Sequence, residues 1–595
     1  MSARDRFVAM RRSSRVALLT GLLGVSGTSG QEDEDIRRHG IFSDSLEVHV
    51  VNVAVVVTDR AGNPVTGLGP DDFEVLEDGD RMEISNFFAV HGDRTAPAPG
   101  PTAVADGTVA ERAPPGPDTR LFLALVVDLH NSLPVNRNLI LQDLETLLPR
   151  ALGPDDRVLI ATYDGRLRVE QAFTADPAEI GAVLERIQRI AGQGSFLGIE
   201  RGRIMAAMTD ATDPLANQAR AMAGFGATDE DILTDAQESL SEITLHAESL
   251  QKQVRQTTEA LGRFSDSLAG LPGRKAVLYL SDGLPLRPAE ELFYAWEGKY
   301  PQVAETEFAS ATLEAEQYST EQAFLDLVAR ANANQVPLYT LFGGGNQRGL
   351  GVHSRDRDLQ TDRHGVNLAA VIGPAMENSM RRLASETGGQ AQIDPRGAGR
   401  LLDGLMTDTS TYYSLGYVPP TPEDGRYHRL KVKMKGRGLR LRYPAGYHAR
   451  TQDERMAART TASLLLDVGD NPLGIRLVLG EQRVEGKDVY RVPVRVQVPV
   501  ANLVMLPEGD RHRGRLSFYV VSQDRDGNLS QVQKIPLQIT IPNEQVQAAV
   551  ASDAAKDLLL QMRVGEQKLA IGVRDEIAAT VSTVNLQVVV GSPPS

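Results

Sequence analysis

The sequence predicts a multidomain protein whose centre is an α/β domain with a doubly wound, Rossmann-like sheet, flanked by β-sandwich-like domains. Two apolar runs of strand length, 121–128 and 275–281, are each closed by an aspartate, Asp128 and Asp282. A continuous apolar strand is covered on both faces, as in a parallel sheet between helices. Strand and helix patterns also alternate through this region. The predicted strands are 121–128, 157–163, 169–173, 275–281, 336–342 and 390–393, and the predicted helices are 136–150, 177–190, 255–270, 320–334, 369–387 and 398–408.

Length and composition limit the possible classes of protein. A chain of 595 residues is expected to form several domains. The formal charge of −15 argues against a general nucleic-acid binder, because phosphate neutralisation needs clustered Lys and Arg. The absence of cysteine excludes disulfides, thiolate metal sites and cysteine nucleophiles, and it suits export without oxidative folding.

The first 30 residues have the layout of a signal peptide. Arginines precede the apolar stretch 16–25, and small residues follow at 26–30. About ten apolar residues are too few to span a bilayer. No later segment reaches that length, so we expect an exported protein, periplasmic or extracellular, without a membrane span. A disordered basic tail is the alternative interpretation of 1–30.

The remaining segments are assigned from strand and turn patterns. Short alternating strands with Asp-Gly turns predict an N-terminal β domain at 46–91. Residues 92–118, rich in Pro, Ala and Gly, are interpreted as a linker. The α/β domain spans 119–410, a tail of strands spans 411–450, and 460–595 is expected to form a β-sandwich-like domain of immunoglobulin-like type.

A long helical insertion, at about 196–260, is predicted within the α/β domain. Apolar residues recur at three- and four-residue spacing from Leu233 to Leu271, with Thr257 as the one polar break. This is the coiled-coil pattern, and it predicts a helix that projects beyond the sheet. Residues 196–225 are the expected antiparallel partner. Packing inside one subunit and an intermolecular coiled coil both fit the pattern, so the oligomeric state is open.

Asp128 and Asp282 are the candidate metal ligands. Parallel sheets place ligand sites outside the carboxyl ends of their strands. Two aspartates that arrive there from different strands can share one hard cation, with hydroxyls and water in the other positions. The sequence therefore predicts a site for Mg²⁺ or Mn²⁺.

These motifs resemble those of von Willebrand factor A (VWA) domains. Their Asp-x-Ser-x-Ser motif is matched by Asp128-Leu-His130-Asn-Ser132, with His130 in place of the first Ser, and Ser281-Asp282-Gly283 matches the later Asp-Gly. The candidate for the family's middle Thr is Ser195. The resemblance implies a metal site formed by Asp128, Ser132, Asp282, His130 and Ser195, at which His130 either binds the metal or only donates a hydrogen bond.

The resemblance extends to exported bacterial VWFA-related proteins of acidobacterial type. It rests on Leu383-Ala-Ser-Glu-Thr-Gly-Gly389, on Tyr412-Tyr-Ser-Leu-Gly-Tyr-Val-Pro419 and on an N-terminal pattern that contains Val55-Val-Val-Thr-Asp59, Asp72-Phe-Glu-Val and Glu77-Asp78-Gly79. In VWA proteins the metal engages a carboxylate of the partner and performs no chemistry. The resemblance therefore implies an adhesion module that binds a protein or cell-surface polymer.

An enzyme is not expected. The sequence lacks a Gly-x-Ser-x-Gly elbow, a His-Glu-x-x-His motif and a phosphate loop ending in Gly-Lys-Ser/Thr. Two alternatives stay open. One is a structural envelope protein whose metal site is vestigial, and the other is a metal-dependent hydrolase using Asp128, His130 and Asp282.

Overall fold

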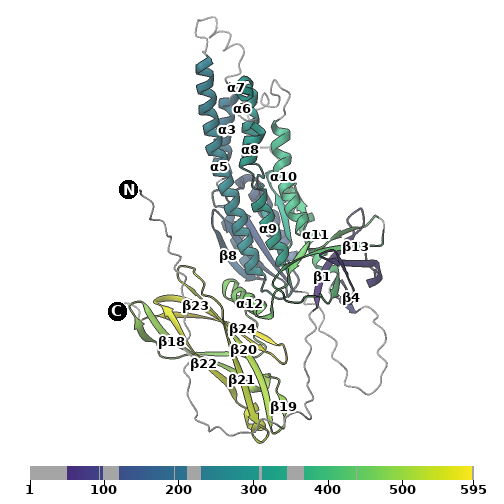
Figure 1. The fold of residues 1–595 in the computed structure, drawn as a ribbon, viewed down its shortest axis with the longest axis vertical. Coiled ribbons are helices and arrows are strands. Elements are labelled where there is room, and N and C mark those ends of the chain that lie inside the picture. Colours follow the sequence, from purple (N-terminus) through teal and green to yellow (C-terminus); the bar gives the residue numbers. More distant parts are fainter. Residues whose placement is uncertain are drawn as a thin grey trace. The chain divides into compact units, whose positions relative to one another are not determined.

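The computed structural model describes residues 50–92, 94–97, 120–192, 194–210, 229–306, 311–344, 368–436 and 438–591. The predicted signal peptide and most of the predicted linker lie outside these ranges. The chain divides into two compact units, Val50–Ala449 and a second that contains Arg450–Ser595. Figure 1 labels the elements of both units.

The first unit contains a six-stranded sheet with strands at all six predicted positions. Its order is β11-β10-β9-β6-β7-β8, and only the β7–β8 pair is antiparallel. From β6 the chain moves outward through β7 and β8, then returns to β9 on the other side of β6. The order thus reverses between β6 and β9, where such sheets place their ligands. The strands are β6 (Leu121–Asp128), β7 (Arg157–Tyr163), β8 (Leu167–Thr174), β9 (Arg274–Ser281), β10 (Leu338–Phe342) and β11 (Ala391–Gln392).

Both faces of this sheet are covered. Every residue of β6 is buried, although successive side chains of a strand point to opposite faces. On one face, Leu123 and Leu125 pack in a core with helices α1 (Pro134–Ala151), α2 (Pro177–Gln188) and α11 (Ala398–Ser410). The other helices next to the sheet are α5 (Asp229–Leu268), which packs against α9 (Glu321–Ala333), and α10 (Leu368–Glu386), which packs on β10.

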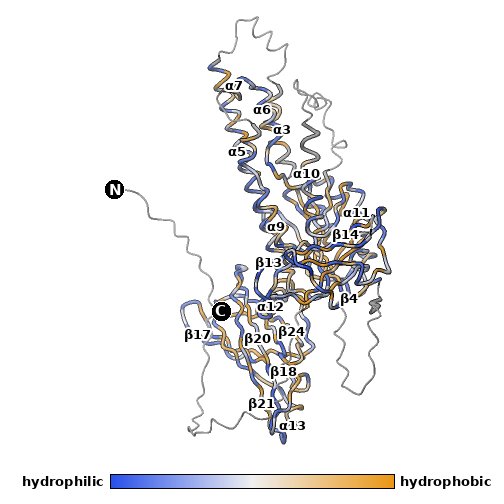
Figure 2. The backbone as a smooth tube through the Cα atoms, turned by 45° about the vertical axis from the view of Figure 1, so that its right-hand side comes forward, coloured by the Kyte–Doolittle hydropathy of each residue, from blue (hydrophilic) through white to orange (hydrophobic). Residues whose placement is uncertain are grey.

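Helix α5 extends far beyond the sheet (Figure 1). Its 40 residues rise about 60 Å at 1.5 Å per residue. Polar and apolar residues alternate along it (Figure 2). The apolar residues that recur at three- and four-residue spacing form one stripe of the helix, which we call the α5 seam. Its residues Ala236, Ile243 and Ala247 are fully buried. They share a core with α3 (Gly194–Asp210) and with α6 (Glu290–Lys299), α7 (Pro301–Thr306) and α8 (Ala311–Gln317). We call these four helices and the amino half of α5 the helical extension.

Among the described residues, the amino half of the α5 seam is therefore covered by other helices of the same chain. Helix α3 supplies part of the expected partner, while 211–228 lie outside the described residues. Helices α6–α8, which follow Asp282, supply the rest. The single tryptophan, Trp296 of α6, is buried there, and its Nε1–H donates to the carbonyl of Ala236 at 2.9 Å.

The β segments before and after the α/β domain pair with each other. One sheet has the order β14-β1-β12-β4-β5 and the other β15-β13-β2-β3, and both contribute to one core. The pairing joins Val51 to Tyr417 and Val75 to Val432. The strands are β1 (Val51–Thr58), β2 (Phe73–Glu77), β3 (Asp80–Met82), β4 (Ile84–His91), β5 (Arg94–Pro97), β12 (Thr411–Tyr417), β13 (Tyr427–Met434), β14 (Arg440–Arg442) and β15 (Gly446–His448).

The second unit has two antiparallel sheets around one core. One contains β16-β18-β17 with β22, and the other β19-β20-β23-β24 with β21. Helix α12 (Gln452–Leu466) packs on β20, β23 and β24. The strands are β16 (Arg476–Leu479), β17 (Arg483–Gly486), β18 (Val489–Pro499), β19 (Leu506–Glu508), β20 (Arg511–Asp524), β21 (Gln533–Pro542), β22 (Asp553–Arg563), β23 (Gly565–Asp575) and β24 (Val581–Val590).

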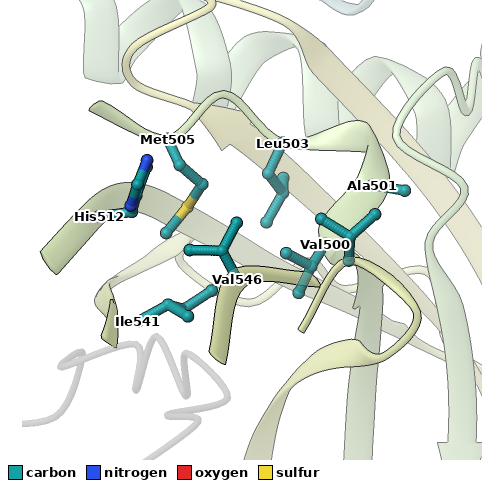
Figure 3. Close-up of a pocket in the computed structure, with 8 residues that line it drawn as sticks. Val500, Ala501, Leu503, Met505, His512, Ile541 and Val546 are labelled. Atoms are coloured by element: carbon teal, nitrogen blue, oxygen red, sulfur yellow. The ribbon is translucent and has the colours of Figure 1, made fainter. Parts of the chain in front are cut away.

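This unit also has an open cavity of about 260 Å³ (Figure 3). It is lined by Val500, Ala501, Leu503, Met505, His512, Ile541, Val546 and Val550. Its lining is apolar apart from His512, whose Nδ1 lies 2.9 Å from Oδ1 of Asn543. In the part of the chain that the structure describes, no helix has the length and apolar character needed to cross a membrane.

Candidate metal-binding site

Asp128 is the last residue of β6, and its carboxylate is held by five protein donors. The side chain is completely buried. Its Oδ1 accepts the backbone N–H groups of His130 at 3.0 Å and Asn131 at 2.9 Å. Its Oδ2 accepts from Asn131 Nδ2 at 2.9 Å, from the Tyr279 hydroxyl at 2.5 Å and from Ser281 Oγ at 3.1 Å. Both oxygens are therefore satisfied within the protein.

Burial dominates the electrostatics of Asp128. It raises the pKa of this carboxyl above its usual value, while the hydrogen bonds from Tyr279, Asn131 and Ser281 oppose the rise. Burial, followed by the charge of Asp128, also raises the pKa of the Tyr279 hydroxyl well above its usual value. Tyr279 therefore stays protonated and serves as a fixed donor to Asp128.

Asp282 follows β9, the strand next to β6, and it is only half satisfied. Its Oδ2 accepts the N–H of Leu133 at 2.7 Å, at the amino end of α1. Its Oδ1 is buried without a hydrogen-bond partner of normal geometry in the described residues. Burial first, and then the charge of Asp128, raises the pKa of Asp282 to about 7, against the effects of the Leu133 N–H, the Asn136 side chain and the Gly343 N–H. Asp282 is therefore a buried carboxyl close to half protonated at pH 7, and its Oδ1 has only weak contacts, with Asn136 and Gly343.

Two glycines let the chain close around Asp282. Gly283 has φ of 103°, which a residue with a side chain rarely adopts, and a Cβ there would lie 2.9 Å from Cβ of Met376 on α10. A Cβ on Gly343, after β10, would lie 2.6 Å from Oδ1 of Asp282. The backbone after β10 can thus approach this carboxylate, and α10 can pack against the turn that carries it.

Ser132 and His130 lie on the loop between β6 and α1. Ser132 is fully buried, and its Oγ has no hydrogen-bond partner in the described residues. His130 is half-buried, and its Nδ1 is likewise unpartnered. Its ring meets the Tyr163 ring edge-on, with the centroids 6.3 Å apart. Because buried polar groups normally have partners, unpartnered atoms on one loop mark a candidate ligand site.

The structure brings four of the five predicted residues to one edge of the sheet. The Asp282 N–H donates to the carbonyl of Asn131 at 3.1 Å, which ties the two strand ends together. The side chain of Ser195 lies outside the described residues. Its helix, α3, begins just after Gly192, where a Cβ would lie 2.8 Å from the carbonyl oxygen of Ser132. The segment that carries Ser195 therefore starts beside the loop that carries Ser132.

The site is not a cage of charged ligands. In the described ranges, Asp128, His130 and Asp282 do not place three ligand atoms within 4.8 Å of one another. The unpartnered oxygens, Ser132 Oγ and Asp282 Oδ1, are the hard donors that Mg²⁺ and Mn²⁺ accept. The residues thus fit a cation that keeps several waters better than one enclosed by protein ligands.

Sequence reasoning missed three residues that shape the site: Asn131, Tyr279 and Thr257. Asn131 bonds Asp128 through its backbone and its side chain. Tyr279 is an interior residue of an apolar strand, and nothing local distinguishes it. Thr257 could have been noticed in the sequence, because it is the one polar residue in the apolar repeat of α5. Its Oγ1 lies 3.4 Å from Nδ2 of Asn131.

The strand order and the two acidic strand ends define an α/β domain whose candidate site lies at the carboxyl edge of its sheet. No family model matches the chain, and no curated protein does. Solved structures that it resembles include a von Willebrand factor type A protein from Catenulispora acidiphila, at 10% identity and a TM-score of 0.22, over 87% of this chain and 72% of that one.

A pili tip protein and a minor pilin are also among the similar structures. The vWF domain of the type V pili tip protein Mfa5 from Porphyromonas gingivalis is 10% identical, with a TM-score of 0.24, over 49% of this chain and 95% of that one. The PilB minor pilin from Streptococcus sanguinis is 10% identical, with a TM-score of 0.23, over 62% and 89%. All of these TM-scores lie below 0.5, so the similarities carry no weight in assigning the site.

Proposed function

We propose that this chain is an exported VWA-type interaction module that binds a protein or surface polymer through a divalent cation. The cation is Mg²⁺ or Mn²⁺, held by Ser132 and Asp282 directly and by Asp128 through water, with His130 and Ser195 as weaker members. The observation that carries the proposal is the pair of unpartnered buried oxygens, Ser132 Oγ and Asp282 Oδ1. They lie where the strand order reverses.

Charge supports a cation at this place. Asp128 and Asp282 each end a buried strand, and the charge of Asp128 raises the pKa of Asp282. Two such carboxylates repel one another unless a cation or proton is shared between them. A cation with one open position can then accept a carboxylate of the partner.

The neighbouring segments favour a recognition role over chemistry. Helix α3 begins beside Ser132, and α6 follows Asp282 after a short connection, so the helical extension and the site share one edge of the sheet. Loops on a rigid scaffold are where binding usually resides. A protein partner at the cation would therefore also meet the helical extension.

Export rests on the sequence of the first 30 residues. Arginines, an apolar stretch and small residues follow one another there, as in a signal peptide. We expect cleavage near Ser26–Gln31. Amino-terminal sequencing of protein recovered from the periplasm or medium tests this, and full-length protein confined to the cytoplasm contradicts it.

A structural role with a vestigial site is the second candidate. It is favoured by the five donors that satisfy Asp128, because this carboxylate needs no cation to stay buried. In that case the chain is an envelope component whose sheet edge keeps its shape through hydrogen bonds alone.

Titration calorimetry with Mg²⁺ and Mn²⁺ on the mature protein separates the two candidates. We expect binding in the wild type that is lost in Ser132→Ala and in Asp282→Asn. Asp326→Asn, at an exposed position on α9, is the matched control and should bind normally. Circular dichroism verifies that each variant is folded. No binding by folded wild-type protein would favour the structural role.

A further inference from the structure

A second cluster of metal-ligating side chains lies in the paired β segments, away from the sheet edge described above. It consists of Glu77, the last residue of β2, Asp78 in the following turn, and His428 of β13. One ligand atom from each lies within 4.8 Å of the others. His428 Nδ1 lies 2.9 Å from Asp78 Oδ2 and 3.3 Å from Glu77 Oε1. Two carboxylates from one segment thus converge on one ring nitrogen from another.

The other nitrogen of His428 fixes the orientation of the ring. Its Nε2 lies 3.1 Å from Oδ1 of Asp424, which precedes β13. A histidine that binds metal usually donates its second ring N–H to a carboxylate. With Nε2–H donating to Asp424, a neutral ring turns the lone pair of Nδ1 toward Glu77 and Asp78. Three electron-rich atoms then face one another, and only a proton or a cation among them relieves the repulsion.

Glu77 and Asp78 are positioned by further contacts. Glu77 is 3% exposed, and its Oε2 accepts from the hydroxyls of Tyr417 and Tyr447. This leaves Oε1 toward His428. Asp78 Oδ1 accepts the backbone N–H of Arg429 at 2.9 Å, which leaves Oδ2 toward His428. In each carboxylate, one oxygen therefore accepts hydrogen bonds from the protein and the other faces Nδ1 of His428.

The distances suit a coordinated metal. Ligands about 2.1 Å from Zn²⁺ and adjacent in its coordination shell lie about 3.0–3.4 Å apart. The separations of Nδ1 from the two carboxylate oxygens, 2.9 and 3.3 Å, are of this size. A mixed set of one imidazole and two carboxylates suits Zn²⁺ better than Mg²⁺. The side chains of Arg426 and Arg429 offset part of the negative charge from outside, through Asp424 and Asp78 respectively.

We propose that Glu77, Asp78 and His428 form a Zn²⁺ site, with Asp424 as the positioning residue for the His428 ring. The site joins two parts of the chain that are 350 positions apart, Asp78 and His428. It is independent of the proposed cation at Asp282. Because the metal binds only when β2 and β13 are paired, it stabilises the folded β segments.

Equilibrium dialysis of the full chain against Zn²⁺, with metal counted by mass spectrometry, tests the proposal. We expect the wild type to retain one Zn²⁺ that His428→Gln and Asp78→Asn both lose. Asp78 is half exposed, so its substitution leaves the fold intact even if His428→Gln does not. Asp424→Asn should weaken Zn²⁺ affinity about 10- to 100-fold without abolishing binding.

Three controls make the result specific. His512→Gln removes a histidine of the second unit and should retain the Zn²⁺. Asp282→Asn should retain it as well, which separates this site from the proposed function. Co²⁺ in place of Zn²⁺ should give visible absorption in the wild type but not in His428→Gln. Wild-type protein that retains no Zn²⁺, or unchanged retention in His428→Gln, would overturn the proposal and leave a protonated His428 bridging the carboxylates.

Discussion

Thr257 Oγ1, on the long helix α5, lies 3.4 Å from Asn131 Nδ2, on the loop that follows β6. Thr257 is fully buried and also donates to the carbonyl of Gln253 in its own helix. Asn131 in turn binds both oxygens of Asp128. Helix α5, the longest helix of the helical extension, therefore contacts the candidate site through the side chain of Thr257.

Thr257→Val should loosen the loop after β6. The substitution keeps the shape of the side chain but removes its polar contact with Asn131, at an expected cost of about 1 kcal/mol. We expect faster amide hydrogen exchange at His130 and Asn131. Thr258→Val is the matched control, because Thr258 is buried and, among the described residues, its hydroxyl bonds to carbonyls of its own helix, Val254 and Arg255. Equal changes in both variants would show that α5 does not act on the loop through Thr257.

Asp282→Asn should stabilise the metal-free protein, and more so at high pH. The folded-state pKa of Asp282 is raised to about 7 from 3.8. Between these values the folded state holds a proton that the unfolded state has released, so wild-type stability falls as pH rises toward 7. Asn does not titrate, so the Asp282→Asn variant does not lose stability in this way as the pH rises. Urea unfolding in EDTA at pH 5 and pH 8 measures the effect, and a difference between variants that does not grow with pH contradicts it.

Ile243→Asp should melt the helical extension and leave the sheet folded. Ile243 is fully buried in the core that α5 shares with α3 and α6. An unpaired charge there costs several kcal/mol. Leu245→Asp, two residues away and 67% exposed, is the control and should have little effect. Limited proteolysis around residue 243 reads out the change. If neither variant is cut faster, the seam does not hold the extension together.

The helical extension should lose stability in acid because of His246. This residue is 8% exposed on α5, and burial lowers the pKa of its ring below 6.5. Glu200, Arg201 and Arg203 of α3 and Glu242 of α5 face it with smaller, partly cancelling effects. As the pH falls through about 6.5, the unfolded state takes up a proton that the folded state does not.

The stabilising effect of a neutral His246 is therefore present above about pH 6.5 and is lost as the pH falls toward the folded-state value. His246→Gln should flatten this dependence. Hydrogen exchange in the amino half of α5 at pH 5.5 and 7.5 provides the measurement. An equally steep dependence in the variant would assign it to another group.

Much of the α/β domain could be predicted because its signals are local. The strand at 121–128 is apolar up to its final residue, Asp128, and the apolar residues of α5 keep their three- and four-residue spacing from Leu233 to Leu268, so the sequence predicts both. The places of Asp128 and Asp282 at the ends of buried strands could be predicted for the same reason, since each closes an apolar run. What covers the amino half of α5 was missed in part, because α6–α8 are short helices whose apolar residues, Trp296 included, have no long period.

Contacts between distant segments could not be predicted in this way. Nothing in Phe73–Glu77 indicates that it pairs with Tyr427–Met434, because strand partners are chosen by the whole fold. For the same reason the cluster of Glu77, Asp78 and His428 is invisible in the sequence. Asp-Gly at 78–79 indicates a turn and not a metal site. A single histidine in a strand does not by itself indicate a metal ligand.

The pairing of β1 with β12 has a consequence for how the protein is made. Val51 is aligned with Tyr417, so the ribosome must add more than 360 residues after the first strand before its partner exists. At 5–20 residues per second, this takes roughly 20 to 70 s. Throughout that time the backbone N–H and C=O groups of β1 are open to other strands. The α/β domain, which is synthesised in between, can complete its own sheet first, so the β segments are the last part of this unit to close.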